Sequence, residues 1–197
     1  GISSRIAYVA NSGSNNVSGY TIATTGALTT IGGSPFSGVT APSAVTVSAN
    51  GSFVYVTNHG GANSVSAFTV NSTTGALTPV AGSPFAAGTT PNAVTVSPNG
   101  NFLYVTNGSS DNVSMFTIDG ATGVLTSPAT IAADTSPSGV SIDPNGLFLY
   151  VANGGSNNVS AYTITAGTGA LTPVSGALGN PFSAGTTPSG IATPGRP

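Results

Sequence analysis

The chain has 197 residues, and only 3% of them are charged: two Arg, four Asp, no Lys and no Glu. Two cations cannot form a basic patch, which excludes nucleic-acid binding and attraction to anionic lipid. Cysteine is absent, which excludes disulfides, cysteine-ligated zinc and thiol nucleophiles, and no apolar run is long enough to insert into a membrane as a spanning helix.

In chain order, the first predicted strand is IAYVAN at 6–11. Four strands are then predicted, SAVTVS (43–48), FVYVTN (53–58), VSAFTV (65–70) and ALTPVA (76–81). Val, Thr, Tyr and Phe dominate them, and these residues suit a pleated, buried surface. The Asn-Gly between the first two of the four is a strong hairpin signal. No segment has a helical period with caps, so we expect an all-β fold.

This four-strand pattern repeats along the chain. Four repeats, roughly 1–48, 49–97, 98–143 and 144–197, fill residues 1–197 as one domain. A four-stranded antiparallel meander with this period is typical of a β-propeller blade. Two landmarks return every 46 to 49 residues, a tyrosine in YVAN or YVTN and a leucine in GAL or GVL: Tyr8, Tyr55, Tyr104 and Tyr150, and Leu28, Leu77, Leu125 and Leu171.

The same motifs point to a known family. YVTN or YVAN after an Asn-Gly turn, followed by VSAFTV and TTGALTPV, resembles the YVTN-repeat propellers and the related lactonase-like seven-bladed propellers of bacteria and archaea. The resemblance covers essentially the whole chain and implies a propeller fold. It also implies activity on a sugar lactone, but no matching catalytic constellation is found in this sequence, so no family residue is carried over.

The two ends of the chain are complementary. The first repeat begins just before a second strand, IAYVAN, and the last ends with a first strand, SGIAT at 189–193. We therefore expect the C-terminal strand to complete the N-terminal blade, leaving no open sheet edge. In cis this closes a four-bladed ring, which is the alternative we favour. In trans the strand completes a blade of another copy, and a contact that does not close makes a filament.

Few residues have the chemistry of a catalytic or metal site. His59 is the only histidine, and it lies in a turn with no Glu, Cys or Lys to assist it as a base. The four Asp are scattered without a calcium-loop spacing, and we interpret Asp111 and Asp143 as turn residues. We therefore predict no catalytic, cofactor or metal residue and no cofactor, while a metal held by backbone carbonyls at the channel stays an alternative.

Asparagine recurs at two kinds of position. One ends the second strand of every repeat, where it either forms a ligand-binding ring at the channel mouth or shapes the local turn; repetition in all blades favours the turn. These residues are Asn11, Asn58, Asn107 and Asn153. The second kind begins an N-x-S/T sequon, a candidate glycosylation site. These residues are Asn16, Asn71, Asn107, Asn112 and Asn158.

Three functions are compatible with these features. We favour a non-catalytic extracellular structural or interaction module, found at the cell surface after removal of a signal peptide. Through strand complementation it would self-associate into a surface layer or filament, or it would contact another surface protein or glycan. The alternatives are a lactonase-like enzyme and a carbohydrate- or protein-binding propeller. The binding face would be the one where the VTN turns and the SPF loops (35–36, 84–85 and 181–182) cluster.

Overall fold

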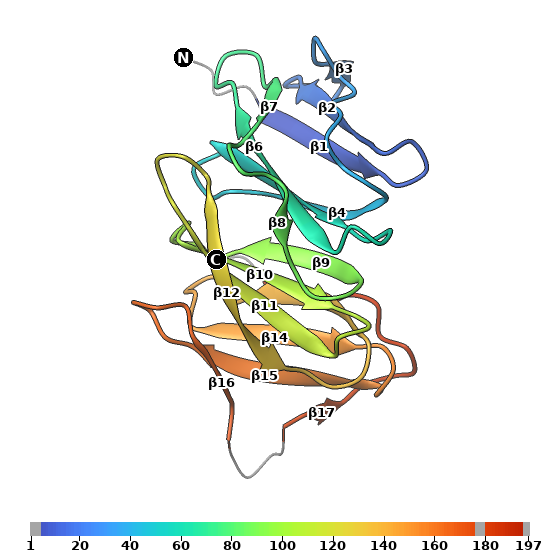
Figure 1. Cartoon of the computed structure of the whole chain (residues 1–197), viewed down its shortest axis with the longest axis vertical. Helices are drawn as coiled ribbons and strands as arrows, with labels where there is room; N and C mark the ends of the chain where they lie inside the picture. The colour runs from blue at the N-terminus through green and yellow to red at the C-terminus, as the bar shows by residue number, and fades with distance from the viewer. Residues whose placement is uncertain (1–4, 176–179, 195–197) are drawn as a thin grey trace.

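A computed structural model describes residues 5–175 and 180–194. The described chain forms four antiparallel sheets, the blades, which follow one another in chain order along the long axis (Figure 1). Blade one contains β1 (Arg5–Asn11), β2 (Asn16–Ile22) and β3 (Leu28–Thr30). Blade two contains β4 (Pro42–Val47), β5 (Phe53–Asn58), β6 (Ser64–Val70), β7 (Leu77–Pro79) and β8 (Phe85–Ala86), which pairs with β6.

The other two blades repeat this arrangement. Blade three contains β9 (Pro91–Val96), β10 (Phe102–Asn107), β11 (Asn112–Ile118) and β12 (Leu125–Ala132). Blade four contains β13 (Pro137–Ile142), β14 (Phe148–Asn153), β15 (Asn158–Ile164), β16 (Leu171–Pro173) and β17 (Phe182–Ser183), which pairs with β15. No helix with the length and hydropathy of a membrane span occurs among the described residues.

The turn between the first and second strands has the same construction in blades two, three and four. Gly51, Gly100 and Gly146 have φ values of 71°, 77° and 71°, a region that glycine enters without steric cost. In blade three the hydroxyl of Ser97 accepts a hydrogen bond from the backbone N–H five residues further on, and in blade four the carboxylate of Asp143 does the same. Asp143 is therefore a turn residue, as predicted.

The core consists of three apolar clusters, one at each joint between neighbouring blades. Because the blades stack face to face, the middle blades are covered on both sides, and β5 and β10 are buried at every position. This explains why FVYV and FLYV are apolar at consecutive positions, whereas a strand with one solvated face alternates.

The first strands line the inner side of the stack. β4 lies beside β9, and β9 lies beside β13. The Ser43 hydroxyl donates to the carbonyl of Pro91 at 2.6 Å, and the Asn92 amide donates to the carbonyl of Pro137 at 3.0 Å. In blades two and three, a side chain of the first strand thus bonds the backbone of the next blade's first strand.

The predicted strands of the second repeat are confirmed, with one difference at the fourth. β7 covers only Leu77–Pro79 of the predicted 76–81, although the N–H of Val80 still donates to the carbonyl of Ala67 at 2.9 Å. The chain then returns along β6, so that in blades one, two and four the loops that end in Pro-Phe lie beside the start of the third strand, next to the VTN or VAN turns, as predicted. The pairs are Val17 with Phe36, Val65 with Phe85 and Val159 with Phe182.

Closure in cis, which the sequence favoured, is not formed in the described chain. Blade one has three strands, and β1 pairs with β2 alone. Residues 188–193 instead lie along β13, where the Ser138 hydroxyl donates to the carbonyl of Pro188 at 2.6 Å and the Thr193 hydroxyl donates to the carbonyl of Ile142 at 2.6 Å. The blades have not turned far enough after four repeats to bring this segment to β1, which lies at the opposite end of the long axis from β17 (Figure 1).

Candidate functional site: the two open ends of the blade arc

Every joint between blades contains the same hydrogen bond. The hydroxyl of Tyr8 donates to the carbonyl of Gly75 at 2.6 Å, and that of Tyr55 donates to the carbonyl of Gly123 at 3.2 Å. Burial raises the pKa of Tyr8 to about 12 and raises the pKa of Tyr55 as well, so both phenols remain protonated donors. The third joint has the equivalent pair, Tyr104 and Gly169, at 2.8 Å.

The same glycine also makes room for the ring two residues before the tyrosine. A Cβ on Gly123 would lie 2.4 Å from the Phe53 ring, and a Cβ on Gly169 would lie 2.4 Å from the Phe102 ring. Each joint therefore has an aromatic or aliphatic side chain and a tyrosine on one blade, and a glycine turn on the next. In blades two to four the third strand carries a buried ring, such as Phe68, which packs against the preceding blade.

Blade four exposes the face that, in blades one to three, packs against the following blade. Phe148 and Tyr150 occupy the places of Phe102 and Tyr104, yet both are partly exposed, whereas the residues of blade three are buried. Val159 is also partly exposed, although its counterpart Val113 is fully buried. We call the surface of Phe148, Tyr150 and Val159 the C-terminal face.

Blade one exposes the face that, in blades two to four, packs against the preceding blade. Val9 is 45% exposed, while its counterparts Val56, Val105 and Val151 are 0% exposed. Leu28 is 57% exposed, while its counterparts in the other blades are 4 to 8% exposed. We call the surface that contains Val9, Leu28 and the intervening ring of Tyr20 the N-terminal face.

The glycine of blade one has no partner ring. Gly26 has a φ of 85° and occupies the place of Gly75, but a Cβ built on it would meet no atom within 4 Å. The N-terminal face therefore offers a free glycine turn, and the C-terminal face offers the phenylalanine and tyrosine that such a turn accommodates in the joints at Gly123 and Gly169.

Residues 188–193 extend the C-terminal face as a segment outside regular secondary structure that lies where the first strand of a further blade would lie. In every repeat, a side-chain oxygen in the turn between the second and third strands accepts the backbone N–H of the residue before the next first strand. The side-chain oxygen of Asn63 accepts the N–H of Thr90 at 3.0 Å, and that of Asn157 accepts the N–H of Thr187 at 2.6 Å. The carboxylate of Asp111 accepts the N–H of Ser136 at 2.8 Å in the same way, so Asp111 is a turn residue. The C-terminal segment is thus seated as the first strand of a fifth blade.

The asparagines that end the second strands face into their blades. The Asn58 amide donates to the hydroxyls of Ser64 and Ser66, at 3.0 and 2.9 Å. Asn11, Asn107 and Asn153 each donate in the same way to two side chains of their third strand, and the last two are fully buried. Each amide links the end of the second strand to the start of the third. The asparagines therefore lie beside the turn, as the turn interpretation predicted, but they bond side chains of the third strand and not the backbone of the turn.

The five sequon asparagines differ in accessibility. Asn71 is exposed, with its carbonyl oxygen accepting the backbone N–H of Thr73 and Thr74. Asn16, Asn112 and Asn158 are partly exposed, and glycosylation at all four stays a prediction. Asn107 is 0% exposed and donates both amide hydrogens inside the blade, so a glycan there would require this side chain to leave its place in the fold.

The remaining polar candidates lie apart from one another. His59 is exposed in its turn, where its backbone N–H donates to the carbonyl of Ala41. Asp119 caps an exposed turn by accepting the N–H of Ala121 and Thr122, as Asn71 does in blade two. Among the residues described, no group of three His, Cys, Asp or Glu side chains could hold a metal ion.

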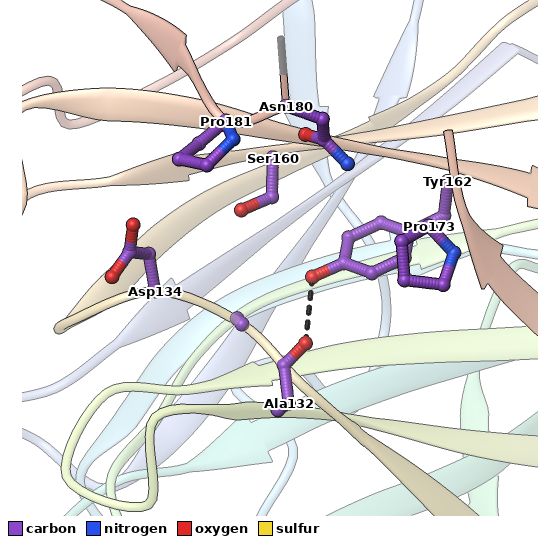
Figure 2. A pocket seen from close by; sticks show the side chains of 8 residues that line it. Ala132, Asp134, Ser160, Tyr162, Pro173, Asn180 and Pro181 are labelled. Atoms are coloured by element: carbon purple, nitrogen blue, oxygen red, sulfur yellow. Dashed lines mark hydrogen bonds between the residues drawn. The ribbon is translucent and has the colours of Figure 1, made fainter. Parts of the chain in front are cut away.

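One pocket of about 180 Å³ lies between blades three and four, with Asp134, Ser160, Tyr162 and Asn180 in its wall (Figure 2). The polar side chains of this pocket already form hydrogen bonds within the fold. Tyr162 donates to the carbonyl of Ala132, and both amide atoms of Asn180 bond the Ala161 backbone. The Asn158 amide and then the Ser156 hydroxyl lower the pKa of Asp134, so this carboxylate stays ionised and cannot serve as a general acid near neutral pH.

The residues that the sequence interpretation missed are the glycine of each GAL or GVL turn and its tyrosine partner. Both recur in every repeat, so their periodicity could have identified them as a matched set. Their contact could not be inferred, because the partners are 65 to 68 residues apart along the chain.

The chain matches known proteins in two comparisons. The model of the seven-bladed lactonase β-propellers matches residues 3–134 and 82–182. A candidate 6-phosphogluconolactonase from Bacteroides uniformis has a TM-score of 0.75 at 22% identity, over 89% of this chain and 55% of that one. The periplasmic gluconolactonase of Pseudomonas aeruginosa has a TM-score of 0.74 at 22% identity, over 92% of this chain and 52% of that one.

Hydrazine synthase of Kuenenia stuttgartiensis also contains this arrangement, with a TM-score of 0.56 at 28% identity over 76% of this chain and 38% of that one. No curated protein matches the sequence. The chain spans about half the length of the two gluconolactonase structures, and its four blades superpose on part of a larger propeller. The family resemblance seen in the YVTN and GAL motifs is confirmed, and the chain belongs to the family of seven-bladed lactonase β-propellers.

Proposed function

We propose that this chain is a non-catalytic interaction module, a propeller arc that serves as a building block of a larger assembly through its two open ends. The observation that carries the proposal is the exposure of Val9 and Leu28, whose counterparts are buried wherever a blade precedes them. Burying one such side chain stabilises a contact by about 1.5–3 kcal/mol, so the two faces together favour association.

The open edge of β1 supports the same function. In blades two to four the second strand is paired on both sides, whereas β1 leaves one row of backbone N–H and C=O groups without a strand partner in the described chain. An unpaired edge is a template for strand addition, and residues 188–193 lie at the place of a first strand without a second strand beside them. Strand complementation supplies what each end lacks.

The composition suggests where such a module works. A surface of Ser, Thr, Asn and Gly with a net charge of −2 has little electrostatic repulsion between copies. We place the module outside the cell or at the cell surface on this ground. Digestion of intact cells with a broad-specificity protease tests the location, because an internal protein would survive.

Light scattering on a size-exclusion column tests the assembly. The intact chain should elute as a species larger than its mass of 18.9 kDa. Deletion of residues 189–197 should return it to the single-chain mass, and so should Val9→Asp, which changes an exposed residue and leaves the blade clusters intact. An intact chain that stays single at all concentrations would overturn the proposal.

Lactone hydrolysis is the second candidate function, and family membership is the observation that favours it. Such chemistry needs acid and base groups that converge in a pocket. Hydrolysis of a gluconolactone by the purified chain, lost in His59→Ala and retained in Val9→Asp, would establish this function and remove the non-catalytic one. Equal rates with and without protein are expected.

A further inference from the structure

Asp134 is the one aspartate that the repeat does not explain. The other three stand at turns where another blade has Asn or Ser in the same place, accepting the same backbone hydrogen bonds; they are Asp111, Asp119 and Asp143. Asp134 lies three residues before the proline that opens a first strand, where the two earlier connections have Val39 and Gly88. Neither of these has a polar side chain, so the charge of Asp134 has no counterpart in the other joints.

Two further polar replacements share the wall of the pocket between blades three and four with Asp134 (Figure 2). Tyr162 has the register position that Phe68 and Phe116 have in the other two joints. Asn180 precedes the proline of the Pro-Phe loop, where blades one and two have serine. The scaffold needs none of these changes, since the other joints form without them. Departures from the repeat that gather at one place indicate a site added to the fold.

The hydrogen-bonding capacity left in this pocket is mostly that of acceptors. Tyr162 donates its only hydroxyl hydrogen to a backbone carbonyl of blade three, which leaves the phenol oxygen to accept. The Asp134 carboxylate accepts the Asn158 amide at 2.7 Å and the N–H of Thr135 at 3.2 Å. Ser156 is its third partner. An ionised carboxylate has about four acceptor positions, and Asp134 is partly exposed, so it can accept from a ligand.

The rest of the wall is apolar, and the pocket is small. Its apolar residues are Ala132, Ala133, Pro173 and Pro181. The volume of about 180 Å³ is slightly more than the roughly 150 Å³ of a protein cavity that binds benzene. Among the described residues of the wall, Asp134 alone is charged, so no cation of the wall offsets it. The pocket is therefore suited to a compact cation with a short hydrocarbon body.

We propose that this pocket binds a small primary alkylammonium ion, with the ammonium group on the Asp134 carboxylate and the hydrocarbon body along the alanines and prolines. An ammonium group donates three hydrogen bonds and accepts none, which matches the free acceptors of Asp134 and Tyr162. The pocket lies in an internal joint of one chain. The inference therefore goes beyond the proposed assembly and does not depend on it.

An NMR titration of the isotope-labelled chain with n-butylammonium tests the site. Saturable shifts are expected at the backbone N–H of Thr135, which bonds the carboxylate, and of Ala161, which bonds Asn180. The neutral analogue n-butanol has the same hydrocarbon body and should not saturate over the same concentrations. A free amine and a lysine side chain of a partner carry the same group, and Nα-acetyl-lysine methylamide separates them. Shifts with both probes assign a lysine side chain as a second source, and shifts with butylammonium alone assign a free amine.

Substitution of the carboxylate measures its part in binding. Asp134→Asn should weaken butylammonium binding about tenfold or more, because hydrogen bonds to charged groups are the stronger ones. The matched control is Asp111→Asn, which removes the same charge at a turn where Asn63 already serves, and it should bind as the parent does. Asp134→Gly, with the residue that blade two has as Gly88, gives a second variant if asparagine disturbs the loop. Circular dichroism shows that each variant is folded.

Four results would overturn the inference. These are no saturable shift in the parent, equal affinity in the parent and the Asp134 variants, equal weakening in Asp111→Asn, and binding of n-butanol as tight as that of n-butylammonium. The third would mean that only net charge matters, and the fourth that the carboxylate has no part in binding. None of these results concerns the mass of the assembly, so a failure here is distinguishable from a failure of the proposed function.

Discussion

Blades two and three are covered on both faces, and blades one and four on one face each, although the same residue types recur at the same places in all four. Val105 and Val9 have the same sequence position within their blades, and only a preceding blade separates a buried residue from an exposed one. The repeat therefore encodes the joint between blades. It does not encode how many blades complete the ring, because the residues on every face are of the kind that packs against a neighbouring blade.

The comparison is sharpest in the monomer, where only the internal joints exist. We expect a Val9→Asp background to keep the chain single, so that equivalent residues can be changed in a joint and at an end with no contribution from association. The stability predictions below use this background.

The largest difference is expected at the leucine of the GAL or GVL turn. Leu125→Ala removes a buried side chain from the joint between blades two and three and should lower the free energy of unfolding by about 2–5 kcal/mol. Leu28→Ala changes its exposed counterpart and should stay within about 0.5 kcal/mol. Urea unfolding of both variants measures the difference, and similar losses would mean that the N-terminal face is buried within the single chain.

The second difference concerns the glycine next to this leucine. Both Gly123 and Gly26 have positive φ, so alanine costs about 1–2 kcal/mol of backbone strain at either position. Gly123→Ala also forces a Cβ into the Phe53 ring and should lose about 1–3 kcal/mol more. Unfolding midpoints of the two alanine variants compare them directly. Equal effects would show that the Phe53 ring moves away at no cost and that the glycine serves the turn alone.

The fold was accessible from the sequence because its signals are local and repeated. FVYVTN, the Asn-Gly turn and VSAFTV each predict their own strand or turn, and four copies in phase fix the blade. The joints were not accessible, since Tyr55 meets Gly123 only after the blades stack. The expectation of closure in cis was wrong for a related reason: SGIAT reads as a first strand, but its position depends on the angle summed over four joints.

Alkaline pH should weaken the internal joints. Burial raises the pKa of Tyr8 to about 12 and also raises the pKa of Tyr55 and Tyr104, whereas an unfolded tyrosine titrates near its ordinary value of about 10. Above this value the unfolded state loses its phenolic protons first and is favoured. The stability is therefore complete below about pH 10 and falls as the pH rises toward about 12. Urea unfolding in this window measures the fall, and Tyr8→Phe should make it shallower. A flat profile would contradict the burial of these phenols.

The smallest effect is expected at the exposed carboxylate of Asp119, which caps the turn that contains Gly123. The backbone N–H groups of Thr122 and then Ala121 lower the pKa of this exposed carboxylate, so the folded state holds its proton more weakly than the unfolded state does. Its contribution to stability is present above the ordinary carboxyl pKa of about 4 and is lost as the pH falls below it. Asp119→Asn installs the residue that blade two already uses as Asn71, which accepts the same two bonds without a charge. The variant should match the parent near neutral pH and lose less stability on acidification, as followed by thermal unfolding. Because this turn belongs to the internal joint at Gly123 and to neither open face, the change should leave assembly unaltered; a change in assembled mass would show that surfaces other than the two open faces take part in association.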